Sequence, residues 1–140
     1  MAVDVAIRAI IALAFLAAIA AVALAARRLA ASRRERVLAA PAHPDLATGR
    51  MTILYFHGDP CSDCVVQERE LDALLIARPD IAIRADHAPS ELSSRFGVLG
   101  VPATVILDGG GRARVVNYGL ARRDVLEQQV GTLVALDASA

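Results

Sequence analysis

The only cysteines of this 140-residue chain, Cys61 and Cys64, are its clearest candidates for chemistry. A C-x-x-C pair can exchange electrons with a partner: one thiolate attacks a disulfide, and the second thiol resolves the mixed disulfide. Two other uses of the pair stay open. It could be a structural disulfide, although so small a loop removes little entropy from the unfolded chain. It could also be half of a zinc site that His57 and His87 complete.

The residues on either side of the cysteines predict how they are held. Residues 52–56 (TILYF) are apolar and rich in β-branched and aromatic types, which indicates a buried strand. From Cys64 to Ala77 apolar residues recur at helical spacing, and Pro79 ends the segment. We assign one face of this helix to Val65, Leu71, Leu74 and Leu75, and the polar face to Gln67, Glu68, Arg69 and Asp72.

Cys61 is therefore expected at a helix N-terminus. The unpaired backbone N–H groups and the positive end of the helix dipole stabilise a thiolate there, so we assign Cys61 as the nucleophile. Cys64, one turn further along, is expected to be the more buried, resolving thiol.

Three neighbours are predicted to tune the pKa values of the two thiols: Asp63, His57 and Tyr55. The carboxylate of Asp63 disfavours a nearby thiolate, which makes the pair a better reductant. Tyr55 has a reference pKa of about 10, so it cannot act as a base at neutral pH. Asp63 or His57 is expected to accept the thiol proton instead.

The rest of the chain after residue 80 alternates strand and helix patterns. We predict a strand over 81–86, a short helix over 90–96, a hairpin of strands 104–107 and 112–117, and a helix over 122–136. The last helix has an apolar set of Val125, Leu126, Val130, Leu133, Val134 and Leu136. The order from residue 51 is β-α-β-α-β-β-α, which predicts an α/β domain.

The N-terminal segment predicts a membrane anchor. Residues 9–26 are eighteen residues without a charge, long enough to span a bilayer. Only Arg8 precedes them, whereas five arginines follow: Arg27, Arg28, Arg33, Arg34 and Arg36. Because positive charge is retained in the cytoplasm, we expect a single-pass anchor with the domain on the cytoplasmic face. A cleaved signal peptide ending at Ala23-Leu24-Ala25 is the alternative.

This gives a membrane helix with an arginine-rich end over 1–36, a linker over 37–50 and a folded domain over 51–140. The lipid bilayer is the partner expected for the first part. The formal net charge is zero, so nothing in the composition indicates a nucleic-acid partner.

The folded domain resembles the thioredoxin family over roughly residues 50–137. The C-x-x-C at the first strand-to-helix junction and residues 96–104 (FGVLGVPAT) carry the resemblance. It implies a minimal thioredoxin-like fold, a four-stranded mixed sheet with flanking helices, without the first strand and helix of full-length members. It also implies that Pro102 is cis beside the cysteines and that the backbone of Val101 pairs with a substrate chain. Pro60 stands where the family commonly has tryptophan, and we place it in the same groove.

The resemblance implies a membrane-tethered thiol-disulfide oxidoreductase. Its Cys61-Ser62-Asp63-Cys64 dithiol would reduce a disulfide in a partner protein, for example another membrane protein, with no cofactor or metal. Reduction requires an upstream electron donor, which the sequence does not name. Two alternatives remain: a non-catalytic adaptor whose groove around Pro102 holds a partner chain, and an extracytoplasmic location, where some anchored relatives act.

Overall fold

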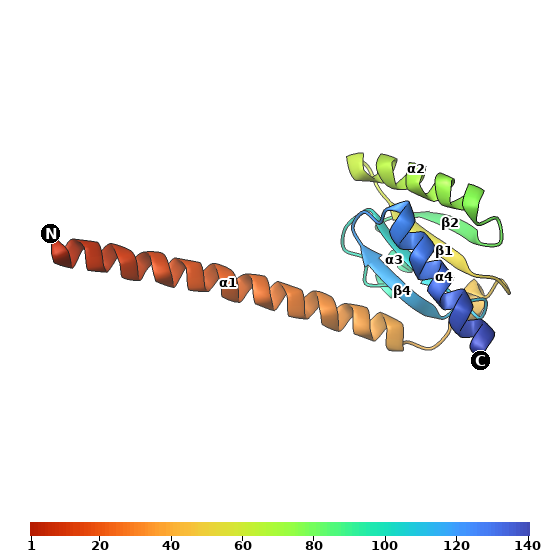
Figure 1. Cartoon of the computed structure of the whole chain (residues 1–140), viewed down its shortest axis with the longest axis horizontal. Coiled ribbons are helices and arrows are strands. Elements are labelled where there is room, and N and C mark those ends of the chain that lie inside the picture. Colours follow the sequence, from red (N-terminus) through yellow and green to blue (C-terminus); the bar gives the residue numbers. More distant parts are fainter. The chain divides into compact units, whose positions relative to one another are not determined.

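The computed structural model describes residues 1–140, except for the side chain of Ala2. The chain divides into two compact units, residues 1–35 and residues 36–140 (Figure 1). The first consists of most of α1 (Ala2–Ala39). At about 1.5 Å per residue, the eighteen uncharged residues extend roughly 27 Å, close to the thickness of a bilayer core.

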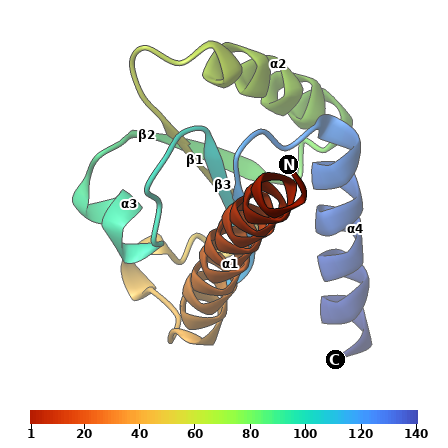
Figure 2. The same cartoon turned by 90° about the vertical axis from the view of Figure 1, so that its left-hand side faces the viewer.

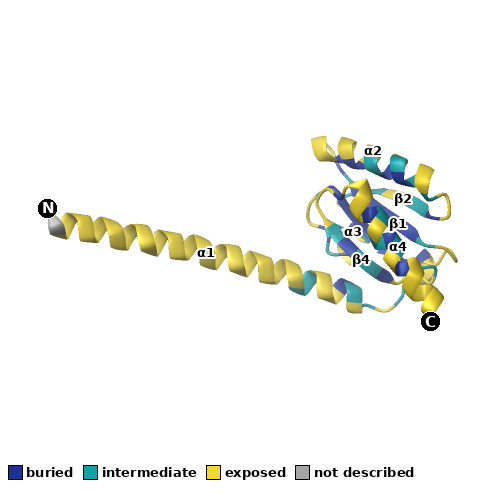
Figure 3. Ribbon diagram, viewed as in Figure 1, coloured by how far each residue is buried: buried dark blue, intermediate teal, exposed yellow. Residues whose placement is uncertain are grey.

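The side chains of this N-terminal unit are exposed almost throughout (Figure 3). Phe15 and Leu16, for example, are 68% and 61% exposed. Within the described part of the chain, α1 is the one helix long and apolar enough to cross a membrane.

The second unit is an α/β domain. After a short 3-10 helix, η1 (Pro44–Leu46), it contains β1 (Thr52–His57), α2 (Ser62–Ala77), β2 (Ala82–His87), α3 (Glu91–Arg95), β3 (Ala103–Leu107), β4 (Ala113–Tyr118) and α4 (Arg123–Ser139). The strand order is β2-β1-β3-β4, with β2 parallel to β1 and the other pairs antiparallel. The predicted element order and the mixed four-stranded sheet are thus confirmed.

Two hydrophobic cores lie on the two faces of the sheet, because successive side chains of a strand point to opposite faces. From β1, Ile53 and Tyr55 belong to the core under α2 and α4. Leu54 and Phe56 belong to the core on the α3 face. Figure 2 shows α3 on one side of the sheet and α2 and α4 on the other.

The segment predicted to be a linker, residues 37–50, is partly built into the domain. Val37 and Leu46 are only 8% and 4% exposed and join the α3-face core. The N–H of His43 donates to the carbonyl of Gly111 at 2.9 Å. Gly111 has a φ of +81°, and a Cβ there would clash with the His43 carbonyl. The five-residue α3 is too short to cover its whole face of the sheet, so residues 37–46 cover part of it.

The helix faces are narrower than the sequence predicts. Val65, placed on the apolar face of α2, is 51% exposed, whereas Gln67, placed on the polar face, is fully buried. In α4 the buried residues are Leu126, Val130 and Leu133, and the exposed ones are Val125, Val134 and Leu136. Each helix contacts the sheet through one stripe of residues spaced three and four apart. Apolar residues beside this stripe are not buried against the sheet.

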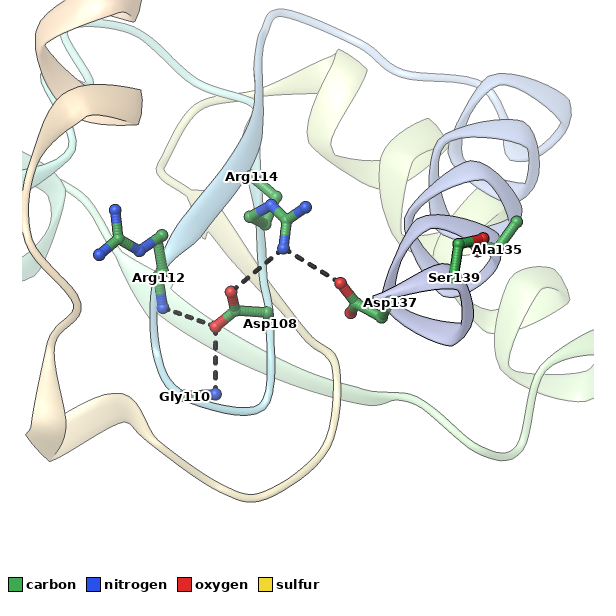
Figure 4. Close-up of polar contacts among 7 residues, drawn as sticks. All are labelled: Asp108, Gly110, Arg112, Arg114, Ala135, Asp137 and Ser139. Atoms are coloured by element: carbon green, nitrogen blue, oxygen red, sulfur yellow. Dashed lines mark hydrogen bonds and ion pairs between the residues drawn. The ribbon is translucent and has the colours of Figure 1, made fainter.

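Polar contacts link the hairpin turn to the end of α4 (Figure 4). One carboxylate oxygen of Asp108 accepts from the N–H groups of Gly110 and Arg112 at 3.1 and 3.0 Å. Arg114 then bridges Asp108 and Asp137, at 3.4 and 3.3 Å. The Asp108 side chain thereby closes the turn of the hairpin.

Candidate active site: the Cys61–Cys64 disulfide

Cys61 and Cys64 form a disulfide where the loop after β1 enters α2. The S–S distance is 1.99 Å and the Cα atoms are 5.3 Å apart. Cys61 is the N-cap of α2, and its Sγ accepts a hydrogen bond from the N–H of Cys64 at 3.1 Å. The predicted helix N-terminus is therefore confirmed, and the sulfur of Cys61 lies where backbone N–H groups favour negative charge.

The two sulfurs differ in access. Cys64 is only 4% exposed and belongs to the core under α2 and α4, whereas Cys61 is partly exposed at the edge of that core. Cys61 is therefore the more accessible residue of the pair. This asymmetry is what a nucleophile and a resolving thiol require.

Tyr55 lies under the disulfide and fixes the first turn of α2. Its hydroxyl donates to the carbonyl of Cys64 at 3.1 Å and is 3.3 Å from a carboxylate oxygen of Glu68. Burial, and then the charge of Glu68 and the hydrogen bond to it, raises the pKa of Tyr55 from 10.0 to about 12. Tyr55 is thus a hydrogen-bond donor at neutral pH.

The sequence pattern places Glu68 on the polar face of α2 and indicates no part for it in the site. Its spacing carried a signal: it follows Cys64 by four residues, so both lie on the same side of the helix.

The other two residues predicted to tune the thiols have different surroundings. Asp63 lies in the first turn of α2 and is exposed. His57 is partly buried at the end of β1; its ring stacks on Tyr55 with centroids 5.5 Å apart and meets His87 edge-on at 5.1 Å. His87 in turn lies 3.2 Å from a carboxylate oxygen of Asp59.

Among the residues that the structure describes, no cluster of three His, Cys, Asp or Glu side chains is arranged to hold a metal ion.

The loop before β3 lies against the loop before the cysteines. The Val101–Pro102 bond is cis, as the resemblance implies. Pro102 is buried, and Val101 is half-buried and packs against both cores. A Cβ on Gly58 would come within 3.2 Å of a methyl carbon of Val101, so glycine permits this close approach. Pro60, also after a cis bond, is exposed beside Cys61.

Gln67 holds the cysteine-bearing helix to the segment before α4. Its side-chain amide donates to the carbonyl of Ala121 at 2.9 Å and accepts from the N–H of the same residue at 2.8 Å. Both groups of the buried amide are satisfied, as a fully buried polar side chain requires. Periodicity could not reveal this role, because a glutamine among charged residues looks solvent-exposed.

Comparison with known proteins identifies the fold. No protein-family model and no curated protein matches the sequence. Among solved structures, a thioredoxin-like protein from Clostridium perfringens is 29% identical, with a TM-score of 0.55 over 61% of this chain and 72% of that one. Thioredoxin-2 of a malaria parasite is 19% identical, with a TM-score of 0.56 over 59% and 82%. An exposed lipoprotein thioredoxin of Streptococcus pneumoniae is 15% identical, with a TM-score of 0.56 over 61% and 87%.

The chain therefore has a thioredoxin-like fold that carries a C-x-x-C disulfide. Its C-x-x-C disulfide lies at the helix N-terminus after the first strand, an arrangement suited to thiol-disulfide exchange.

Proposed function

We propose that this protein is a membrane-tethered thiol-disulfide oxidoreductase that reduces a disulfide in a partner protein. The observation that carries the proposal is the asymmetric disulfide at the N-terminus of α2, with Cys61 partly exposed and Cys64 buried. A structural disulfide would need no accessible sulfur at a helix N-terminus.

The reaction begins with the reduced pair. The Cys61 thiolate attacks a sulfur of the partner disulfide, forming a mixed disulfide and releasing one partner thiolate. Cys64 then loses its proton and attacks the Cys61 sulfur, which forms the Cys61–Cys64 bond and releases the second partner thiolate. Two electrons pass to the partner, whose thiolates take up two protons. A dithiol donor must then reduce the disulfide again.

The partner chain would lie against the loop before β3. The exposed Pro60 directly precedes Cys61, and the half-buried Val101 lies against Gly58 of the same loop and precedes the strand β3. An extended substrate segment could pair with that backbone as an added strand, while Pro102 gives the loop its shape.

Anchoring by α1 would place this chemistry at a membrane. The apolar length of the helix supports a single span, and the arginines after it support a cytoplasmic location for the domain. A partner in the same membrane would then meet the disulfide at high effective concentration.

Cysteine substitutions test the proposed chemistry. In a turnover assay with insulin as the disulfide substrate, Cys61→Ser should abolish reduction, because it removes the attacking sulfur. Cys64→Ser should retain attack and accumulate a mixed disulfide through Cys61, which non-reducing electrophoresis detects. Equal turnover by wild type and Cys61→Ser would instead support an adaptor without redox chemistry.

A reporter fused after Ala140 tests the location. A reporter active only in the cytoplasm should be active in this fusion. Activity of a reporter that works only outside the cytoplasm would reverse the proposed topology.

A further inference from the structure

The strand β2 leaves one edge of the sheet unpaired. Within the described chain its only neighbour is β1. Ala82 is the first residue of β2, and Ala88 directly follows its last residue. Their N–H groups donate to carbonyl groups of the β1 segment at 3.0 and 2.8 Å. Because backbone groups alternate in direction along a strand, those of the odd-numbered residues point to the open edge. These residues are Ile83, Ala85 and His87.

The same strand carries two opposite charges on its α3 face. Along β2, Arg84 and Asp86 alternate with the residues whose backbone groups point to the open edge. They pair in register with Leu54 and Phe56 of β1. Among the described residues Arg84 has no ion-pair partner, and Asp86 accepts a hydrogen bond from the Ser90 hydroxyl. Charges on an edge strand usually discourage pairing, but opposite charges facing each other across two strands stabilise it.

We propose that β2 pairs antiparallel with β2 of a second copy of the chain, about a two-fold axis at Ala85. In this register, Ala85 lies opposite Ala85 of the second copy and Ile83 lies opposite His87. The backbone groups of these residues point to the open edge and can pair across the two strands. It also places Arg84 opposite Asp86, twice per dimer.

The charges select this register over its neighbours. A shift of the second copy by two residues in one direction places Arg84 opposite Arg84. The same shift in the other direction places Asp86 opposite Asp86. Both shifts put like charges directly across from each other, which is destabilising. If both charges on β2 had the same sign, they would repel in all three of these registers. They would then protect the edge from pairing with another strand.

Exposed apolar residues on α2 support the same arrangement. Glu68 and Asp72 line a hollow beside β2, so their side of the helix borders the open edge. Ile76 follows Asp72 by four residues and Val65 precedes it by seven, so both lie on that side of the helix. They are 85% and 51% exposed. The two-fold axis brings opposite ends of the two helices together, so that Ile76 of one copy approaches Val65 of the other.

The active site stays open in this dimer. The open edge is on the β2 side of β1, whereas the loop carrying Val101 leads into β3 on the opposite side. The dimer therefore leaves the partly exposed Cys61 and the proposed substrate loop accessible, and it does not depend on the redox proposal.

Disulfide cross-linking at the axis tests the register. The full chain, with Cys61 and Cys64 both replaced by serine, would carry Ala85→Cys and be reconstituted in phosphatidylcholine vesicles. Directly opposite residues in a hydrogen-bonded antiparallel pair have Cα atoms about 5.5 Å apart, within the range that a disulfide spans. Mild oxidation should therefore produce a covalent dimer. The matched control His87→Cys places its two thiols roughly 13 Å apart along the strands, so it should cross-link at least ten-fold more slowly.

Charge reversal tests the same register without a new thiol. Arg84→Asp should raise the dimer dissociation constant about ten-fold, because both opposite-charge pairs become like-charge pairs. The double variant Arg84→Asp with Asp86→Arg restores opposite pairs and should restore dimer formation, measured by sedimentation of the full chain in detergent.

Three results would overturn the proposal: a chain that is monomeric in both media, a dimer unaffected by Arg84→Asp, or Ala85→Cys that cross-links no faster than His87→Cys.

Discussion

The two faces of the sheet are held together in different ways. The face under α2 and α4 contains the disulfide and buried polar side chains, and Tyr55 and Gln67 there make specific hydrogen bonds to backbone groups. The α3 face is hydrocarbon and aromatic: Leu54, Phe56 and Phe96 are fully buried in it. The polar face can fix the position of the redox helix, because hydrogen bonds are directional. The apolar face contributes stability with little directional preference.

The largest effect on stability should come from the apolar face. Phe96→Ala removes a fully buried ring that packs on Phe56 and on His43. We expect a loss of about 3 to 5 kcal/mol in the free energy of unfolding, measured by urea denaturation of the full chain in detergent. The reduction potential should remain unchanged. A change in the reduction potential without a loss of stability would contradict the assignment of stability to the α3 face and of the position of α2 to the opposite face.

A smaller loss of stability, localised at α2, should follow from Gln67→Ala. The substitution leaves the N–H and the carbonyl of Ala121 without their partner, and we expect a total loss of roughly 1 to 3 kcal/mol because water can enter the space that the side chain leaves. Hydrogen exchange of the Ala121 amide should accelerate in step with the loss of unfolding free energy. The control Gln128→Ala changes an exposed glutamine of α4 and should have little effect on either measurement. Unchanged exchange at Ala121 would remove Gln67 from this role.

The raised pKa of Tyr55 predicts a loss of stability in alkali. Below pH 10 this tyrosine is protonated in both folded and unfolded chains, so its contribution is fully present. As pH rises from 10 towards about 12 the unfolded chain ionises first, and the free energy of unfolding falls. Tyr55→Phe should reduce that fall. Identical alkaline profiles for the wild type and Tyr55→Phe would disprove the assignment.

The smallest effect should come from Asp63→Asn. The exposed carboxylate is in the first turn of the helix that Cys61 caps, and its removal should favour the thiolate and therefore the reduced form. We expect the equilibrium with glutathione to shift towards the reduced protein by roughly two- to five-fold, typical of one exposed charge near a helix end. Asp72→Asn, further along the same helix, should shift it less. A shift towards the oxidised protein would show that Asp63 does not act on the Cys61 sulfur.

The sequence by itself determined the chemistry and most of the fold. The C-x-x-C pair, the strand before it and the helix after it are local patterns, and local patterns depend on backbone preference and periodicity within a few residues. The same is true of the long apolar helix and of the hairpin around its glycine-rich turn. Each of these could be placed to within a few residues without knowing what packs against it.

Only the tertiary structure decided which side chains those elements bury. Gln67 is buried because Ala121, 54 residues away, supplies both hydrogen-bond partners, whereas Val65 on the same helix is 51% exposed. Val37 and Leu46 join the domain because α3 is too short to cover its face alone. The open edge of β2 depends on the strand order of the whole sheet. Burial depends on contacts between distant segments, and periodicity within one segment carries no information about its partner.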